Sequence, residues 1–264
     1  MPKHLGECYL LNRYNVPIKE KTDTKRRNNG LMKEYIHGGD IYRHPDVLDY
    51  SANINPLGTP PGVIRAAKDS MERVCHYPDA CQEKLKQALA EYEQVPVEWL
   101  ICGNGAAELI FALVQAVKPK RALVLAPTFA EYAQALEAVG CEVNREILKK
   151  EDGFALQDRI LDRLQKEDLQ MVFLCNPNNP TGILMDPKLL QKIVTLCEKR
   201  QIYLVVDECF LDFVPEPEVH TLKGELKGKK YLFLLKAFTK RYAMAGLRLG
   251  YGITSGETDR KSVV

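Results

Sequence analysis

The segment KAFTKRYAMAGLRLGYG, residues 236–252, places two cations in a frame of small and apolar residues. Lys240 follows Thr239, and Arg248 stands eight residues further on. An amine in a desolvated pocket loses its charge and becomes a nucleophile toward an aldehyde, and a guanidinium with a hydroxyl can hold a phosphate. The alternative for Lys240 alone is a surface lysine whose alkyl stem covers apolar neighbours. The other segments must therefore decide between the two.

A glycine-rich turn provides a candidate phosphate site. GNGAAELIFALV follows the apolar run WLIC, and Gly105 precedes a helical pattern that opens at Ala106 and Ala107. The first backbone N–H groups of a helix lack partners and carry the positive end of its dipole, so they can cradle a phosphate. The alternative is an ordinary glycine turn. Glu108 stands where a dinucleotide fingerprint has its third glycine, and no Gly-Lys-Ser/Thr follows, so nucleotide binding is disfavoured.

Two further strand ends carry polar side chains. NPNNPTG, residues 176–182, follows the run MVFLC, and its prolines make a rigid loop that presents Asn179. Asp207 and Glu208 follow IYLVV, where a buried carboxylate is costly unless a cationic or protonated group meets it. An ordinary Asn-Pro turn and a structural ion pair are the alternatives. Together with the cradle and Lys240, these groups match the contacts that pyridoxal phosphate requires.

Alternating helical and strand patterns surround these segments. Runs such as MVFLC and YLVVD are apolar on both faces, as in a parallel sheet covered by helices, so we expect an α/β fold. Ligands of such sheets bind beyond the carboxyl ends of the strands, where the polar residues stand. Strands are predicted at 99–102, 121–126, 141–148, 170–175, 202–207, 231–235 and 249–253, and helices at 62–74, 80–93, 105–117, 129–139, 155–166 and 186–200.

Composition limits the class of partner. The 264 residues are 45% hydrophobic and 27% charged, which suffices for a sizeable core. Because 37 Lys and Arg face 35 Asp and Glu, no strong field favours nucleic acid or an anionic membrane. No run spans a bilayer, and the N-terminus lacks the apolar stretch of a signal peptide. The eight cysteines form no C-x-x-C pair, so we expect a cytoplasmic protein without a metal site. We expect its partner to be a small molecule.

The motifs GNGAAE, NPNNPTG, DE and TKRYAMAGLRLGY occur in the order and at the spacing of one family. Across residues 33–255 the sequence resembles the fold-type I pyridoxal-phosphate enzymes of the class I/II aminotransferase group. Within that group the N-terminal part looks most like the L-threonine-O-3-phosphate decarboxylases of cobalamin biosynthesis, which are related to the histidinol-phosphate aminotransferases. The segments HGGDIY (37–42), LDYSANINPLG (48–58) and HYPDA (76–80) carry this finer resemblance.

The resemblance implies a domain organisation. A three-layer large domain with a mostly parallel sheet, of the pyridoxal-phosphate transferase type, is expected at 76–255, after an arm and part of a small domain at 32–75. Residues 1–31 end in the polar run KEKTDTKRRNNG and are expected to be a poorly ordered extension, and 256–264 a truncated tail. Family members continue into a small C-terminal domain that holds the substrate carboxylate, and that domain is expected to be missing.

The resemblance also implies individual roles. Lys240 would be the Schiff-base lysine, and Asp207 would pair with the pyridinium nitrogen. Phe129 would stack on the cofactor ring, with Tyr132 the weaker candidate. Asn179 would bond the ring hydroxyl. The phosphate ligands would be Gly105, Ala106, Ala107, Thr239, Arg248 and, from the neighbouring subunit of a homodimer, Tyr77. The phosphorylated amino acid would contact His37, Gly38, Asn53 and Asn179.

Two positions depart from the family pattern. Ala237 stands where a serine usually gives the phosphate a hydroxyl, so cofactor affinity is expected to be lower. Phe210 stands where most aminotransferases have a tyrosine that bonds the ring hydroxyl, and phenylalanine is familiar in the decarboxylase branch.

The activity that the resemblance implies is decarboxylation of L-threonine O-3-phosphate to (R)-1-amino-2-propanol O-2-phosphate. The first alternative is a histidinol-phosphate-type aminotransferase, because the residues that orient the carboxylate, and so select the bond that breaks, belong to the missing domain. The second is a cofactor-binding fragment without turnover.

Overall fold

The computed structural model describes residues 39, 41–42, 46 and 48–255. The predictions for residues 1–31, His37, Gly38 and the tail at 256–264 lie outside this part of the chain. Contacts divide the chain into one unit that ends at Asn53 and a second that begins at Ile54. Within the described part of the first unit, the Gly39 amide donates to Ser51 Oγ at 2.8 Å, and the Ser51 hydroxyl donates to Asp49.

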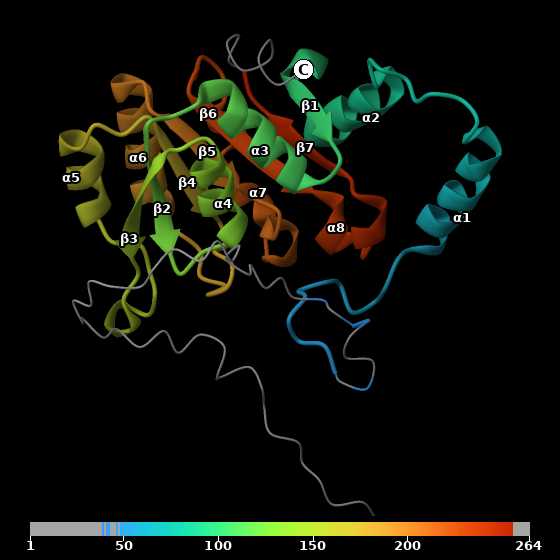
Figure 1. Ribbon diagram of the computed structural model, residues 1–264, viewed down its shortest axis with the longest axis horizontal. Helices are drawn as coiled ribbons and strands as arrows, with labels where there is room; N and C mark the ends of the chain where they lie inside the picture. The colour runs from blue at the N-terminus through green and yellow to red at the C-terminus, as the bar shows by residue number, and fades with distance from the viewer. Residues whose placement is uncertain (1–38, 40, 43–45, 47, 256–264) are drawn as a thin grey trace, which may run out of the picture. The chain divides into compact units, whose positions relative to one another are not determined.

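A seven-stranded sheet forms the centre of the second unit, in the order β1-β7-β6-β5-β4-β2-β3 (Figure 1). Strand β7 runs antiparallel to both of its neighbours, and all other neighbouring pairs are parallel. The sheet is therefore mostly parallel, as predicted. The strands are β1 Leu100–Gly103, β2 Arg121–Ala126, β3 Glu142–Ile147, β4 Met171–Cys175, β5 Tyr203–Asp207, β6 Leu232–Ala237 and β7 Gly250–Ile253.

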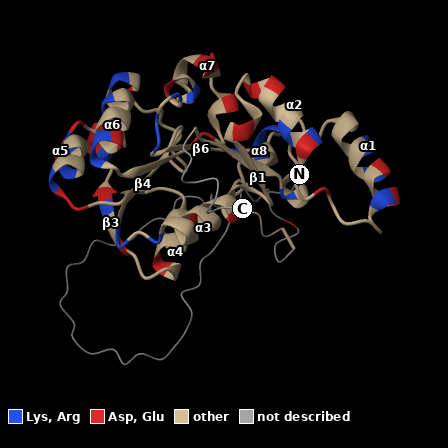
Figure 2. Ribbon diagram, turned by 90° about the horizontal axis from the view of Figure 1, so that it is seen from above, with Lys and Arg blue, Asp and Glu red and all other residues tan. Residues whose placement is uncertain are grey.

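Helices cover both faces of the sheet, which gives the three layers that the sequence predicts. Figure 2 shows α3 and α4 on one face and α5 and α6 on the other. The bounds are α1 Pro61–Ser70, α2 Glu83–Glu93, α3 Ala106–Val117, α4 Ala130–Ala138, α5 Arg159–Lys166, α6 Pro187–Arg200, α7 Pro217–His220 and α8 Phe238–Arg241. None of the helices in the described part of the chain is both long and apolar enough to cross a bilayer.

The core has two parts, one on each face of the sheet. Strand β4 shows the division, because all five of its residues are buried. Val172 and Leu174 pack with α5 and α6, whereas Phe173 and Cys175 pack with α3 and α4. This confirms the inference that MVFLC is apolar because both of its faces are covered.

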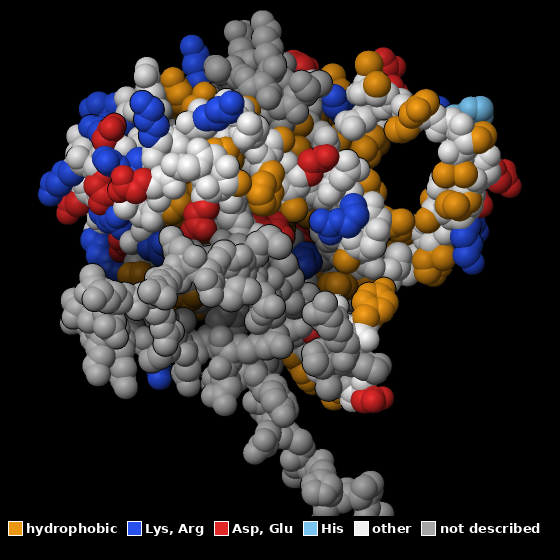
Figure 3. All heavy atoms as spheres, viewed as in Figure 1, with side chains coloured by type: hydrophobic (Ala, Val, Ile, Leu, Met, Phe, Trp, Pro, Cys, Tyr) orange, Lys and Arg blue, Asp and Glu red, His pale blue; other side chains and the backbone are white. Residues whose placement is uncertain are grey.

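Helix α1 differs from the helices on the sheet. None of its residues is buried. Large apolar side chains are exposed along α1 and just beyond it, including Ile64 at 45%, Met71 at 63% and Val74 at 72% (Figure 3).

Some element boundaries differ from prediction. Helix α2 begins at Glu83 rather than at residue 80, because the Asp79 carboxylate accepts from the amides of Cys81 and Glu83 and Gln82 adopts a left-handed φ of 55°. Helix α5 begins at Arg159 rather than at 155. The one-turn helices α7 and α8 were not predicted, because four residues carry no helical periodicity.

Candidate active site

The candidate site lies where neighbouring strands end. Strands β4, β5 and β6 run parallel, and Cys175 and Asp207 are partners in the register of β4 and β5. The NPNNPTG loop, Asp207 and the segment that contains Lys240 therefore begin at the same edge of the sheet. Figure 1 shows β6 leading into α8.

The phosphate cradle is brought to this edge by β7. Gly250 of β7 pairs with Ala237 at the end of β6. A Cβ built on Gly250 would stand 2.6 Å from the Ala106 amide nitrogen, at the start of α3. Only glycine permits this approach, so β7 fixes the amino end of α3 beside the end of β6.

Arg248 lies against Gly105 at the candidate phosphate cradle. Gly105 has a φ of 90°, which favours glycine, and a Cβ on it would stand 2.9 Å from Arg248 Nη2. The guanidinium thus lies over the turn that opens α3. Glu108, which replaces the third glycine of a dinucleotide motif, instead accepts from the Asn104 backbone and side-chain amides and closes the turn.

Thr239 has a buried side chain whose hydroxyl makes no hydrogen bond to any described residue. Thr239 and Arg248 are thus both available to an anion at the start of α3. Arg248 is exposed, although the segment around it is rich in small and apolar residues.

Asp207 is buried and holds two hydrogen bonds. The Tyr132 hydroxyl donates to Oδ2 at 2.6 Å, and the Cys209 amide donates to Oδ1 at 2.9 Å. Burial raises the pKa of the Asp207 carboxyl, while these hydrogen bonds and the charge of Lys240 oppose the rise. A cationic group bound against this carboxyl would favour its charged form.

Tyr132 orients Asp207, a role that sequence reasoning missed. Its side chain is fully buried, and its ring stacks on Phe173 with centroids 5.0 Å apart and planes at 11°. The Tyr132 ring is thus packed on one face, and its hydroxyl is bonded to Asp207. Phe129 meets it edge-on at 5.5 Å and is only partly buried, so Phe129 remains the aromatic side chain available for ring stacking. The signal for Tyr132 was its position three residues after Phe129 in the predicted helix at 129–139.

The asparagines of NPNNPTG have different roles. Asn176 accepts from the Met185 amide at 2.9 Å. Asn178 accepts from Thr128 Oγ1 at 2.9 Å and donates to the Pro127 carbonyl at 3.1 Å. Within the described part of the chain, the half-buried Asn179 side chain has no hydrogen-bond partner, so it is available to a ligand.

Lys240 lies on α8, with Nζ 5.6 Å from the centre of the Phe210 ring. Its side chain is half-buried. Asn55 holds the backbone here, because its amide donates to the Lys240 carbonyl at 3.1 Å and its side chain donates to the Arg241 carbonyl at 2.8 Å. Sequence reasoning missed Asn55, for which the sequence gives no physical signal.

Glu208 faces away from Asp207. Its buried carboxylate accepts from Thr221 Oγ1 at 2.7 Å and the Leu222 amide at 2.9 Å, and it pairs with Lys236 Nζ at 3.5 Å. The structural ion pair considered for the DE motif therefore applies to Glu208. Lys236, within the otherwise apolar β6, was the signal that such a partner existed.

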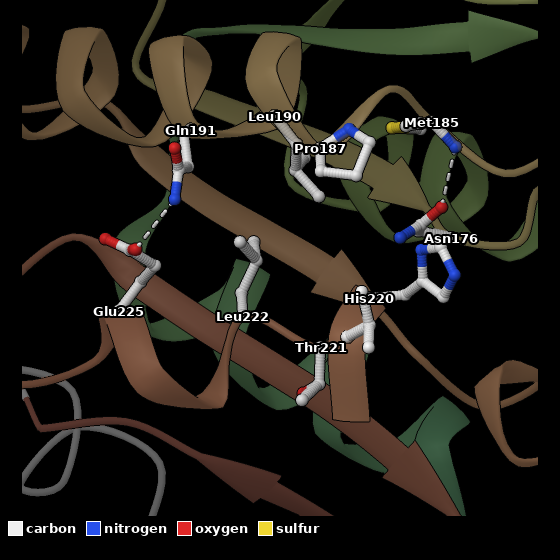
Figure 4. A pocket seen from close by; sticks show the side chains of 10 residues that line it. Asn176, Met185, Pro187, Leu190, Gln191, His220, Thr221, Leu222 and Glu225 are labelled. Carbon is white, nitrogen blue, oxygen red and sulfur yellow. Dashed lines mark hydrogen bonds between the residues drawn. The ribbon is translucent and has the colours of Figure 1, made fainter. Parts of the chain in front are cut away.

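A separate small cavity lies between α6 and residues 219–225 (Figure 4). Its lining includes Asn176 and His220, and Gln191 there donates to Glu225 at 3.3 Å. Asp207, Lys240 and Arg248 are not among the lining residues, so this cavity is distinct from the candidate site.

Two predicted site residues are not placed against the others. Tyr77 is fully exposed in the second unit. Asn53 is exposed and ends the first unit, so its predicted contact with substrate stays a prediction.

The donor set at the strand ends fits one kind of molecule. A phosphate could be bound by the start of α3 together with Arg248 and Thr239. Asp207 could pair with a cationic nitrogen, and Lys240 offers an amine to an aldehyde. The family comparison agrees, because the model of the class I and II aminotransferases matches residues 45–260. The chain belongs to this family. Its members depend on pyridoxal 5'-phosphate, which confirms the predicted cofactor.

Relatives in the family include enzymes of two kinds. The chain is 45% identical over 229 residues to a threonine-phosphate decarboxylase of Salmonella typhimurium, covering 84% of this chain and 62% of that protein. It is 36% identical to a histidinol-phosphate aminotransferase of Desulfitobacterium hafniense, covering 78% and 57%. A solved histidinol-phosphate aminotransferase of Clostridium acetobutylicum superposes with a TM-score of 0.74 at 29% identity, covering 82% of this chain and 63% of that one. The chain thus spans about three fifths of the length of these relatives, and the α/β fold prediction is confirmed.

Proposed function

We propose that the protein is a pyridoxal-phosphate lyase that decarboxylates L-threonine O-3-phosphate to (R)-1-amino-2-propanol O-2-phosphate, a step of cobalamin biosynthesis. The observation that carries this proposal is the 45% identity to a threonine-phosphate decarboxylase, compared with 36% to a histidinol-phosphate aminotransferase. Phe210 beside the Lys240 amine is a second support, because it offers the cofactor no hydroxyl.

Each residue of the site has a proposed task. Asp207, held by Tyr132 and the Cys209 amide, keeps the ring nitrogen protonated. Arg248, Thr239 and the first amides of α3, at Ala106 and Ala107, hold the phosphate. The bound cofactor supplies an electron sink for the substrate α-carbon.

The remaining tasks concern the ring and the substrate. Phe129 stacks on the ring, and Asn179 bonds its hydroxyl. Lys240 holds the cofactor aldehyde before substrate arrives and moves a proton at the α-carbon afterwards.

The proposed partners are a small phosphorylated amino acid and a second copy of the chain. His37, Gly38 and Asn53 are the proposed contacts of the substrate. Tyr77 is proposed to reach the cofactor phosphate of the neighbouring subunit, and its full exposure leaves the side chain available for such a contact.

Transamination is the competing activity. It is favoured by the similarity to histidinol-phosphate aminotransferases, and the same Lys240 and cradle would serve it. The two reactions would differ in which bond of the substrate α-carbon is held perpendicular to the cofactor ring. That choice depends on where the substrate carboxylate is bound.

The test is to supply the protein with pyridoxal phosphate and O-phospho-L-threonine and to measure carbon dioxide. We expect carbon dioxide without transfer of the amino group to 2-oxoglutarate, and Lys240→Ala should lower the rate at least ~100-fold. Amino transfer from histidinol phosphate to 2-oxoglutarate without carbon dioxide release would replace the proposal by the aminotransferase. Cofactor binding without either reaction would support the second alternative, a cofactor-binding fragment without turnover.

A further inference from the structure

We propose that Arg241 is a positioning residue that fixes where the Lys240 amine stands. The inference rests on the proposed function, in which Lys240 holds the cofactor aldehyde. Arg241 follows Lys240 directly on α8, and its contacts with Tyr92, Asp212 and Tyr242 are called the Arg241 clamp below.

The clamp joins α8 to the segment that follows Asp207. Arg241 Nη1 pairs with Asp212 Oδ1 at 3.2 Å. The neighbouring Lys240 Nζ stands 5.6 Å from the ring of Phe210, which caps the short 3-10 helix Leu211–Phe213. Two successive cations of α8 thus contact the same 3-10 helix and its cap. Arg241 therefore sets the distance of Lys240 from the chain that carries Asp207.

The guanidinium has polar and aromatic partners. It donates to the Tyr92 hydroxyl on α2, and its carbon lies 5.9 Å from the Tyr92 ring and 5.4 Å from the Tyr242 ring. The Arg241 and Asp212 side chains are 40% and 33% exposed, so their ion pair alone adds little stability. Both polar contacts use the same nitrogen, Nη1, while the planar group as a whole lies near the two rings. A lysine has no planar group to place near these rings, so it would not reproduce this orientation.

Helix α8 depends on such external contacts. It comprises only Phe238–Arg241 and ends before Ala243, which has a left-handed φ of 47°. A single turn does not hold itself in water. Asn55 secures its carbonyl groups, and the Arg241 clamp secures its side-chain face. Without the clamp the turn can shift, and the Lys240 amine then spends less time where it meets the aldehyde.

The test measures how fast Lys240 captures the cofactor. The full chain is mixed with pyridoxal phosphate, quenched with borohydride at intervals, and the cofactor fixed on the Lys240 peptide is measured by mass spectrometry. Arg241→Gln and Asp212→Asn should each slow capture about tenfold, since small misplacement of a reacting group is costly. Arg241→Lys should slow it as well. The double variant should be no slower than Arg241→Gln, because both changes remove one interaction.

A matched control and a second ligand separate positioning from general damage. Arg121 has the same 40% side-chain exposure and pairs with Glu142 at 3.3 Å at the start of β2, so Arg121→Gln should capture at the wild-type rate. Pyridoxamine phosphate has no aldehyde and reports the rest of the site. Its affinity should change less than about twofold in Arg241→Gln or Asp212→Asn, because the phosphate and ring contacts remain.

Each other outcome overturns a stated claim. Wild-type capture rates in both clamp variants would remove the role of Arg241. An equal loss of pyridoxamine phosphate affinity would make the clamp a structural support of the whole site rather than a positioning contact. If the wild-type chain itself fixes no cofactor on Lys240, then the proposed function fails first, and the inference fails with it.

Discussion

Ala237 stands beside the phosphate cradle without a hydroxyl to offer it. It pairs with Gly250, which lies against the first amide of α3, so a side-chain oxygen at this position would stand near the bound phosphate. We expect Ala237→Ser to tighten pyridoxal phosphate binding about fivefold, the effect of one added hydrogen bond. Fluorescence titration of the two proteins measures it, with the exposed Ala138→Ser on α4 as control. Unchanged or weaker binding would mean that the hydroxyl does not reach the phosphate.

Which site residues could be predicted depends on how local their signal is. Lys240 and Asp207 stand in short motifs at strand ends, so a role could be proposed for each from its neighbours. The Tyr132 bond to Asp207 joins residues 75 positions apart, and the Asn55 bond to the Arg241 carbonyl spans 186. No period in the sequence encodes such pairs, because packing of distant elements creates them. They became visible only in the folded chain.

At the scale of elements, the close contact of β7 with α3 shapes the proposed phosphate cradle. We expect Gly250→Ala to weaken pyridoxal phosphate binding at least about tenfold, because its Cβ would meet the Ala106 amide nitrogen at 2.6 Å and displace the amino end of α3. Titration with the cofactor measures the loss. Gly246→Ala in the same segment is the control, since its Cβ would meet nothing within 4 Å. Equal affinities in the two variants would show that the cradle does not depend on β7.

Helices and strands were predictable where their burial leaves a pattern of apolar residues in the sequence. All seven strands appear near their predicted positions. Strands covered on both faces, such as β4, are uniformly apolar, whereas the edge strand β3 is mostly polar. The direction of β7 was not predictable, since LGYGI is equally apolar in either direction and its pairing depends on the chain between it and β6. Helix α8 has too few residues to show a pattern, although it carries Lys240.

At the scale of the whole molecule, buried charges tie the helix layer to the sheet. Glu93 ends α2, and its carboxylate pairs with Lys223 at 3.2 Å and with Lys236 of β6 at 3.5 Å. Tyr251 of β7 donates to the same carboxylate, and Lys236 also pairs with Glu208 beyond β5. These residues connect α2, β5, β6 and β7, the elements around the site. They therefore support its frame without touching the cradle.

Removing the Glu93 charge should destabilise this frame in a pH-dependent way. We expect Glu93→Gln to lower the free energy of unfolding by about 3 kcal/mol at pH 7, because the ammonium groups of Lys223 and Lys236, whose side chains are only 17% and 14% exposed, lose a partner. Burial raises the pKa of the Glu93 carboxyl. The charge of Lys236, the hydrogen bond from Tyr251 and the charge of Lys223 outweigh this effect and hold the pKa of Glu93 below the ordinary 4.5. The stability that Glu93 adds is thus present above about pH 4.5 and is lost as the pH falls through the folded-state pKa. Urea unfolding from pH 7 to pH 3 should show that the difference in the free energy of unfolding between wild type and Glu93→Gln becomes smaller as the pH falls. The control Glu91→Gln, at an exposed position on the same helix, should have almost the wild-type free energy of unfolding at pH 7. A gap that stays constant across this range would mean that Glu93 acts through packing rather than charge.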